Sequence, residues 1–234
     1  MADLIRLDDP ETVVSLRRSA RARRLTLTVP QNGDPPRVTA PPHASAAEIR
    51  MFLLRQSDWL RRALDRAPAL VRVAPGARLP VAGRMLTIET APGPRHPPHI
   101  EGERLIVQGR GDAGPRIRVW LKEGARAALS PVVAACAAEI GAAPGRITMR
   151  DTKGRWGSCT SRGDLMFSWR LAMAPPDVLD YVAAHEAAHL IEMNHGPRFW
   201  ALVTRLRPGW KSRRDWLRHQ GAALHRYRFE AQED

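Results

Sequence analysis

The chain has 234 residues, 44% of them hydrophobic and 26% charged, with a formal net charge of +13, which excludes a wholly disordered protein and indicates one or two folded domains. The longest weakly polar stretch, residues 127–138, is too short to cross a bilayer, and no signal-peptide pattern opens the chain. Two cysteines make no disulfide framework. We therefore expect a cytoplasmic protein with no membrane contact. The basic excess lies mostly before residue 150 and suits a nucleic-acid partner, but 34 of the 37 basic residues are arginine, which codon bias in a GC-rich genome explains equally well.

The N-terminal part, residues 1–110, is predicted to be rich in β-structure and to contain one basic helix. Apolar residues alternate with threonine over 25–29 and recur in short runs between 70 and 108, as they do in half-buried strands. Ser45 and Glu48 have the spacing of a capping box, which predicts a helix that ends before Pro68. The segment 109–115 is rich in glycine and separates this region from a second domain, residues 111–234.

The second domain is predicted to be mostly helical, with a small sheet. One helix is expected from Pro115 to Leu129, and Ser130-Pro131 has the pattern of an N-cap and first residue of another, which ends near Gly141. Short strands are expected at 147–149 and 165–167, on either side of a glycine-rich loop. Three further helices are expected after Pro176, Pro197 and Ser212. The predicted fold class is therefore α+β.

The most informative segment is His185-Glu186-Ala187-Ala188-His189. Two histidines four residues apart on a helix project from one face and can bind a single zinc ion. Glu186 is then placed to take a proton from a water molecule activated by the metal and to deliver it to the leaving group. We therefore predict that Glu186 is the catalytic residue and that Glu186→Gln keeps zinc but loses turnover.

A catalytic zinc site needs a third protein ligand, and two candidates follow the second histidine. Glu192 lies seven residues after His185, on the same face if the helix continues. His195 lies ten residues after His185 and reaches the metal only if the helix ends first, which we expect near Met193–Asn194, before Gly196-Pro197. We favour His195, which leaves Glu192 as a partner of the ligands or as a surface carboxylate.

A second unusual segment runs from Lys153 to Cys159. Its two glycines allow a ligand to approach the backbone closely, and Arg155 can bind a carboxylate or a phosphate. Trp156 suits either the core or the site. We predict substrate-binding roles for Lys153, Arg155 and Trp156, and a structural role for Cys159 rather than one as a metal ligand.

Several motifs lie in order along this part of the chain: Arg155-Trp156-Gly157-Ser158-Cys159, Tyr181-Val182, His185 to Leu190, Asn194-His195 and Phe199-Trp200. Together they resemble the YgjP-like metal-dependent hydrolase family, which is related to the SprT and WLM zinc metallopeptidases, and Arg17 to Leu27 also matches that pattern. The resemblance implies a zincin-like domain after a β-rich N-terminal portion. It also implies that His185, His189 and His195 are the zinc ligands and that Glu186 is the catalytic acid and base. Ala187-Ala188 and Gly196 depart from the family pattern, but none of them is a ligand.

Two enzymatic functions remain open. A zinc metallopeptidase acting on peptides or unfolded proteins is the first, and a strand near 165–169 would pair with an extended substrate. A zinc-dependent nucleotide pyrophosphatase is the second, because arginine suits phosphate recognition and phosphoanhydride hydrolysis has been attributed to the family that the chain resembles. A nucleic-acid-binding protein with a structural zinc is disfavoured, because structural sites usually have four ligands, often cysteines.

Overall fold

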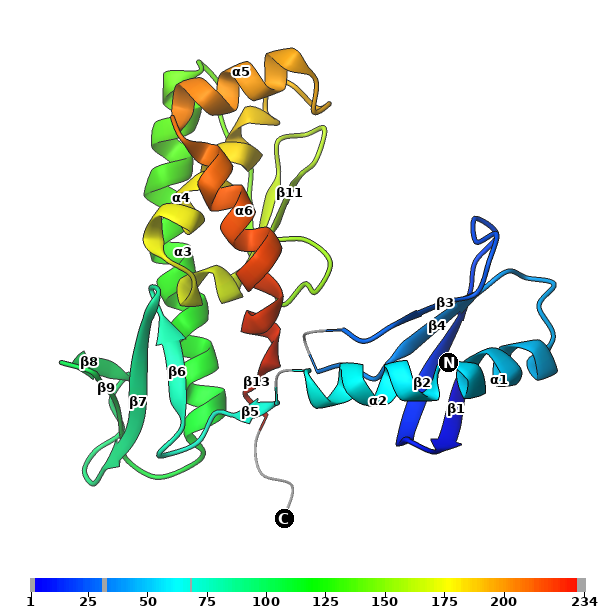
Figure 1. The fold of residues 1–234 in the computed structure, drawn as a ribbon. Coiled ribbons are helices and arrows are strands. Elements are labelled where there is room, and N and C mark those ends of the chain that lie inside the picture. Colours follow the sequence, from blue (N-terminus) through cyan, green and yellow to red (C-terminus); the bar gives the residue numbers. More distant parts are fainter. Residues whose placement is uncertain (1–2, 31–32, 68, 231–234) are drawn as a thin grey trace. The chain divides into compact units, whose positions relative to one another are not determined.

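The computed structural model describes residues 3–30, 33–67 and 69–230 (Figure 1). The chain divides into two compact units, residues 1–70 and 71–234, and each unit has its own hydrophobic core. Six α-helices and several small sheets in the described residues confirm the predicted α+β class. None of the described helices is long and apolar enough to cross a membrane.

The first unit combines a four-stranded sheet with two helices. The strands lie in the order β1 (Asp3–Asp8), β2 (Glu11–Arg18), β4 (Arg37–Ala40) and β3 (Thr26–Thr28). Helix α1 (Ala46–Arg55) begins with the predicted capping box of Ser45 and Glu48, and α2 (Ser57–Asp65) follows it directly. The single helix expected here is thus two helices, separated at Gln56. The separation allows Leu60 of α2 to be buried in the same core as Leu53 of α1.

The second unit begins with another four-stranded sheet, which the sequence analysis had assigned to the N-terminal region. Its strands lie in the order β6 (Arg78–Val81), β7 (Arg84–Ala91), β9 (Arg104–Gln108) and β8 (His99–Glu101). Leu79, Ile88 and Leu105 of the sheet share one core with Ile117 and Leu121 of the helix that follows. The chain therefore divides between residues 70 and 71 and not, as the sequence suggested, between 110 and 111.

Helix α3 (Ala113–Glu139) is the long axis of the second unit (Figure 1). The sequence predicted two helices that meet at Ser130-Pro131, but α3 continues through Pro131. The hydroxyl of Ser130 donates to the carbonyl of Arg126, four residues earlier, rather than capping a new helix. Leu129 and Val133, on either side of the proline, are both fully buried. Burial of this continuous apolar face offsets the hydrogen bond that proline cannot donate.

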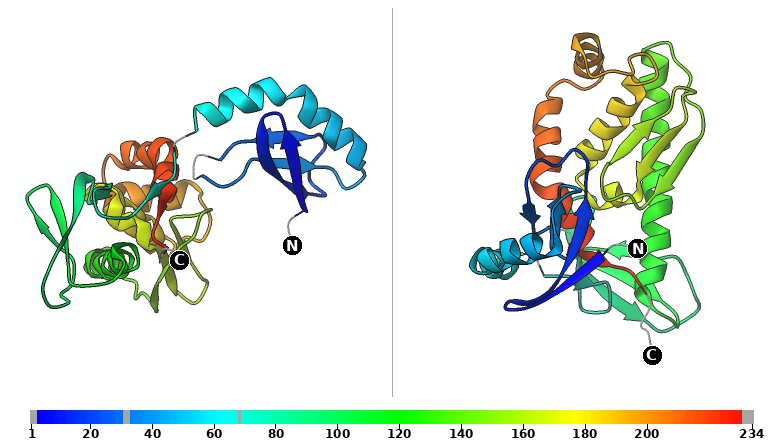
Figure 2. Two further views of the ribbon diagram at one scale, coloured as in Figure 1. Left: turned by 90° about the horizontal axis from the view of Figure 1, so that it is seen from below. Right: turned by 90° about the vertical axis from the view of Figure 1, so that its right-hand side faces the viewer.

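A three-stranded sheet and helix α4 form the framework of the site. The sheet has the order β10 (Ile147–Arg150), β12 (Leu165–Ser168) and β11 (Gly157–Cys159), with β12 parallel to β10 and antiparallel to β11. Helix α4 (Pro176–Ala188) packs between α3 and β11 (Figure 2). The prediction that a strand at 165–169 pairs with an extended substrate is therefore wrong, because β12 is already paired on both sides. The edge strand beside α4 is β11.

The C-terminal segments close the unit around α4. Helices α5 (Pro197–Leu206) and α6 (Trp210–Gln220) both contact α4. Two 3-10 helices, η1 (Trp169–Met173) and η2 (Gly221–Arg226), lie on either side of these elements in the chain, and β13 (Tyr227–Arg228) pairs in parallel with β5 (Val71–Arg72). The buried Arg170 of η1 binds Asp151 through two hydrogen bonds of 2.7 and 3.1 Å, and it also donates to two carbonyls near the C-terminus.

Candidate metal centre

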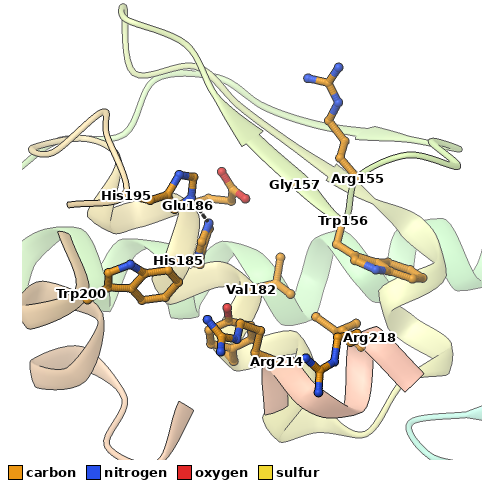
Figure 3. A pocket seen from close by; sticks show the side chains of 12 residues that line it. Arg155, Trp156, Gly157, Val182, His185, Glu186, His195, Trp200, Arg214 and Arg218 are labelled. Carbon is orange, nitrogen blue, oxygen red and sulfur yellow. Dashed lines mark hydrogen bonds between the residues drawn. The ribbon is translucent and has the colours of Figure 1, made fainter. Parts of the chain in front are cut away.

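Three histidines come together where α4 ends. Helix α4 stops at Ala188 with His189 as its C-cap, so the helix end expected near Met193–Asn194 is wrong by about one and a half turns. The chain then turns tightly, and the N–H groups of residues 191 and 192 both donate to the carbonyl of Ala188. This early turn brings His195 back, so that its Nε2 lies 3.1 Å from Nε2 of His185 (Figure 3). One ligand nitrogen from each of the three histidines lies within 4.8 Å of the other two.

The three imidazoles are suited to hold a metal ion. Two nitrogens bound to one tetrahedral zinc lie about 3.3 Å apart, close to the separation of the His185 and His195 nitrogens. Nδ1 of His189 donates to the backbone carbonyl of Glu192 over 2.9 Å, which leaves its Nε2 lone pair available as a ligand. Burial, aided by its two histidine neighbours, lowers the pKa of His185 to about 3, so its ring is neutral, the form that binds metals.

The cluster has the composition of a catalytic centre rather than a structural one. Among the described residues it contains three nitrogen donors and no fourth protein ligand, which leaves one tetrahedral position open. His195 is exposed, so the site is open to solvent on that side. Glu192 contributes through its backbone carbonyl, as a partner of a ligand, which agrees with one of the two roles left open for it.

An aromatic wall from α5 fixes the orientation of the rings. The fully buried ring of Phe199 lies 4.9, 4.4 and 4.7 Å from the ring centres of His185, His189 and His195. Trp200 lies 5.9 Å from His185 and 5.8 Å from His195. Close packing of this kind holds ligands in position before a metal binds.

Glu186 lies beside the histidine cluster and is nearly inaccessible, at 5% exposure. Burial raises the pKa of its carboxyl to about 8, and the charge of Arg155 opposes this shift. Strand β11 passes so close that a Cβ added at Gly157 would lie 2.5 Å from Oε1 and from Cγ of Glu186. Glycine at this position therefore makes room for the carboxylate between strand and helix.

Two adjoining cavities open at the cluster, with volumes of about 480 and 460 Å³. Both are lined by Arg155, Gly157, His185, Glu186 and His195. The first cavity continues toward α6, and the second continues along β11 toward Ser158 and Cys159. The first is also lined by Trp156, Tyr181, Val182, Trp200, Arg214, Leu217 and Arg218.

The residues predicted to bind substrate are only partly brought to the site. Trp156 lines the first cavity and Arg155 lines both, whereas Lys153 lines neither. Cys159 lines the second cavity but is outside the metal-binding cluster, and burial raises the pKa of its thiol, which disfavours the thiolate that metals bind.

Sequence reasoning missed the contribution of α6. Arg214, Leu217 and Arg218 line the first cavity, and their spacing of three and four residues places them on one helix face. That periodicity was the available signal. On its own it does not distinguish a face that lines a site from a face in contact with solvent.

Comparison with known families agrees with this geometry. The model of the YgjP-like metallopeptidase domain matches residues 23–220. The chain belongs to the YgjP-like family. A metallopeptidase domain implies a metal-dependent hydrolase, and the histidine cluster is where this YgjP-like chain can hold the metal. Comparisons with curated proteins and with solved structures gave no significant match.

Proposed function

We propose that this YgjP-like protein is a zinc-dependent peptidase, with His185, His189 and His195 as the metal ligands and Glu186 as the general base. The observation that carries the proposal is the set of three converging imidazoles beside a buried carboxylate. Zinc prefers nitrogen and sulfur ligands in tetrahedral geometry, and hydrolytic zinc sites commonly have three protein ligands and one open position.

The mechanism assigns one task to each group. The metal, when bound, supplies Lewis-acid chemistry, which acidifies a water molecule and polarises the carbonyl under attack. Glu186 accepts the proton of the attacking water on its carboxylate and then donates it to the leaving amine. The carbonyl of Glu192 holds the imidazole of His189 in the tautomer that presents Nε2.

Strand β11 supports a peptide as the substrate. In its pairing with β12, Trp156 accepts from the N–H of Ser168, and Thr160 donates to the carbonyl of Asp164. Because alternate residues of an antiparallel strand face opposite sides, the backbone groups of Gly157 and Cys159 face away from β12. An extended peptide can pair with this edge, which runs beside Glu186.

Nucleotide hydrolysis is the second candidate, and one observation favours it. Arg155, Arg214 and Arg218 line the first cavity, and arginine is well suited to phosphate groups. A nucleotide would use that cavity alone, however, whereas the second, adjoining cavity continues along β11 and suits an extended polymer. We therefore favour the peptidase.

The deciding experiment compares two substrates on zinc-loaded protein. We expect the wild type to cleave an unfolded protein and Glu186→Gln to do so at least about 100-fold more slowly, the usual contribution of a general base. Glu192→Gln is the matched control: it changes a nearby carboxylate whose backbone, not side chain, holds His189, so turnover should persist. Zinc content should equal that of the wild type in both variants. Hydrolysis of nucleoside triphosphates that depends on Glu186, without proteolysis, would establish the second candidate instead.

Two further expectations concern the surroundings of the enzyme. Both cysteines are unpaired, which suits the proposed cytoplasmic location. A nucleic-acid partner of the N-terminal unit would use the exposed Arg21, Arg23 and Arg24. Binding to DNA should then weaken steeply with salt, and an absence of binding at low salt would remove this partner.

A further inference from the structure

The first cavity has a charge pattern that the proposed metal chemistry does not use. Three of its lining residues, Arg155, Arg214 and Arg218, are cationic, and its one lining carboxylate is the buried Glu186. A concave surface with this excess of positive charge attracts an anionic group.

Arg214 is the arginine best placed to bind such a group. Its guanidinium carbon lies 4.8 Å from the ring centre of Trp210 and 5.5 Å from that of Trp200, and the two indole rings stack at 4.3 Å. Stacking of this kind fixes the plane of the guanidinium while its N–H groups remain available. Two other arginines of α6 form ion pairs: Arg213 pairs with Asp177, and Arg218 pairs with Asp215. Within the described residues Arg214 has no ion pair.

Arg214 lines the same cavity as His185 and Glu186. In Figure 3, Arg214 lies below His185, on the α6 side of the site. An anion bound to Arg214 would therefore occupy the cavity that opens at the histidine cluster.

The remaining walls of the cavity are apolar and rigid. Trp156, Val182 and Leu217 line it together with Trp200. The Trp156 ring is packed so closely against Gly221 that a Cβ there would lie 2.8 Å from it. The pocket thus combines an apolar surface with arginine side chains, of which Arg214 is held by stacking against two indole rings.

We propose that this cavity is a substrate subsite for a peptide carboxylate, either an Asp or Glu side chain or the terminal carboxylate, and that Arg214 binds it. A planar carboxylate matches the guanidinium fork with two parallel hydrogen bonds. The proposal rests on the peptidase function, in which the second cavity and β11 would accommodate the rest of the peptide. Arg214 determines specificity in this scheme and takes no part in proton transfer.

The first experiment profiles cleavage of a complex peptide mixture by mass spectrometry. Wild-type protein should show enrichment of Asp and Glu, or of the chain terminus, at one position relative to the cleaved bond. Arg214→Met should reduce that enrichment roughly 10-fold, the scale of one charge-assisted interaction, because it should lower kcat/KM for acidic peptides more than for neutral ones. Lys211→Met is the matched control, because it removes one charge from the same helix at an exposed residue outside the cavity.

The second experiment measures binding without turnover. In the Glu186→Gln background, labelled peptides that differ only as Glu against Gln, or as free against amidated C-terminus, report affinity by fluorescence anisotropy. Preference for the Glu peptide supports the side-chain source, and preference for the free terminus supports the terminal source. In either case the preference should disappear with Arg214→Met and persist with Lys211→Met.

Three results would overturn the subsite. The first is the absence of any acidic preference in wild-type cleavage and binding. The second is an equal loss on acidic and neutral peptides in Arg214→Met, which would place Arg214 in the reaction itself. The third is binding of nucleoside triphosphate, but not of acidic peptide, that depends on Arg214. Binding of acidic peptide that depends on Arg214, in a protein that cleaves no peptide, would refute the peptidase and keep the subsite.

Discussion

Gly157 is where β11 meets the proposed general base, so Gly157→Ala perturbs one contact of the catalytic machinery. The added Cβ would lie 2.5 Å from Cγ and Oε1 of Glu186 and 2.7 Å from its Cδ. Carbon atoms in ordinary contact are about 3.5–4.0 Å apart, so strand and carboxylate must separate by about 1 Å. Gly157 lies in a regular strand and its φ is not positive, so alanine fits the backbone and the conflict arises from the side chain alone.

The magnitude follows from how little room Glu186 has. The side chain is 5% exposed and its helix is packed against α3, so the displacement moves the carboxylate away from its working position. A misplacement of about 1 Å can lower a catalytic rate about 100-fold, equivalent to about 2.7 kcal/mol of transition-state stabilisation. Overpacking of this kind lowers the free energy of unfolding by about 1–3 kcal/mol. The metal affinity should persist, because the nearest atoms to the new Cβ all belong to Glu186.

The assay measures zinc content, melting temperature and kcat/KM on one peptide for wild type, Gly157→Ala and Gly154→Ala. Gly154 lines the second cavity in the same segment, but a Cβ there meets no atom within 4 Å, so this variant should keep wild-type turnover. Full turnover in Gly157→Ala would refute the idea that β11 positions the base. An equal loss in Gly154→Ala would assign the effect to the loop rather than to the contact.

Three further predictions test other contacts of the second unit. Arg170→Met should lower the free energy of unfolding in urea by about 3 kcal/mol, because it removes a buried cation that holds Asp151 and two backbone carbonyls. The control Arg104→Met, at an exposed ion pair, should lower it by no more than about 0.5 kcal/mol. Equal losses in the two variants would show that burial of Arg170 does not matter. Cys159→Ala should keep metal content and turnover, and loss of metal would make the thiol a ligand. Zinc at 1,000 times its dissociation constant should stabilise the protein by about 4 kcal/mol, so the melting temperature should fall when a chelator removes the metal. The melting temperature of His195→Ala should respond little to zinc or to the chelator.

The convergence of the three histidines could be predicted because their geometry is local. The spacing of His185 and His189 fixes their common face, and the rise of a helix shows that His195 can reach them only after a turn. The position of that turn was misjudged, because no glycine or proline marks the helix end at Ala188. Instead, Leu190 in the turn packs against the core of the second unit, which is built from segments far apart in the sequence.

Contacts distant in sequence also explain the other differences. Pro131 is a reliable signal for a helix start only when no buried face continues across it, and α3 has such a face. Gly109 and Gly111 lie in a bend before α3 and have positive φ angles, but the strands before them share a core with α3. The glycine content of this segment therefore located a loop correctly. It could not show that the strands before the loop and the helix after it belong to one hydrophobic core.

The early end of α4 has an electrostatic consequence for the chemistry. Because the helix stops at Ala188, the cluster lies at its C-terminal end, where the helix dipole contributes partial negative charge. This field favours a bound cation beside His185 and His189. The same field disfavours the ionised form of Glu186, in the same direction as its burial, so it strengthens that carboxylate as a proton acceptor. A helix that continued to Asn194 would move this negative end away from both groups. The turn that brings His195 to the cluster thus also brings the helix terminus to the three histidines and to Glu186.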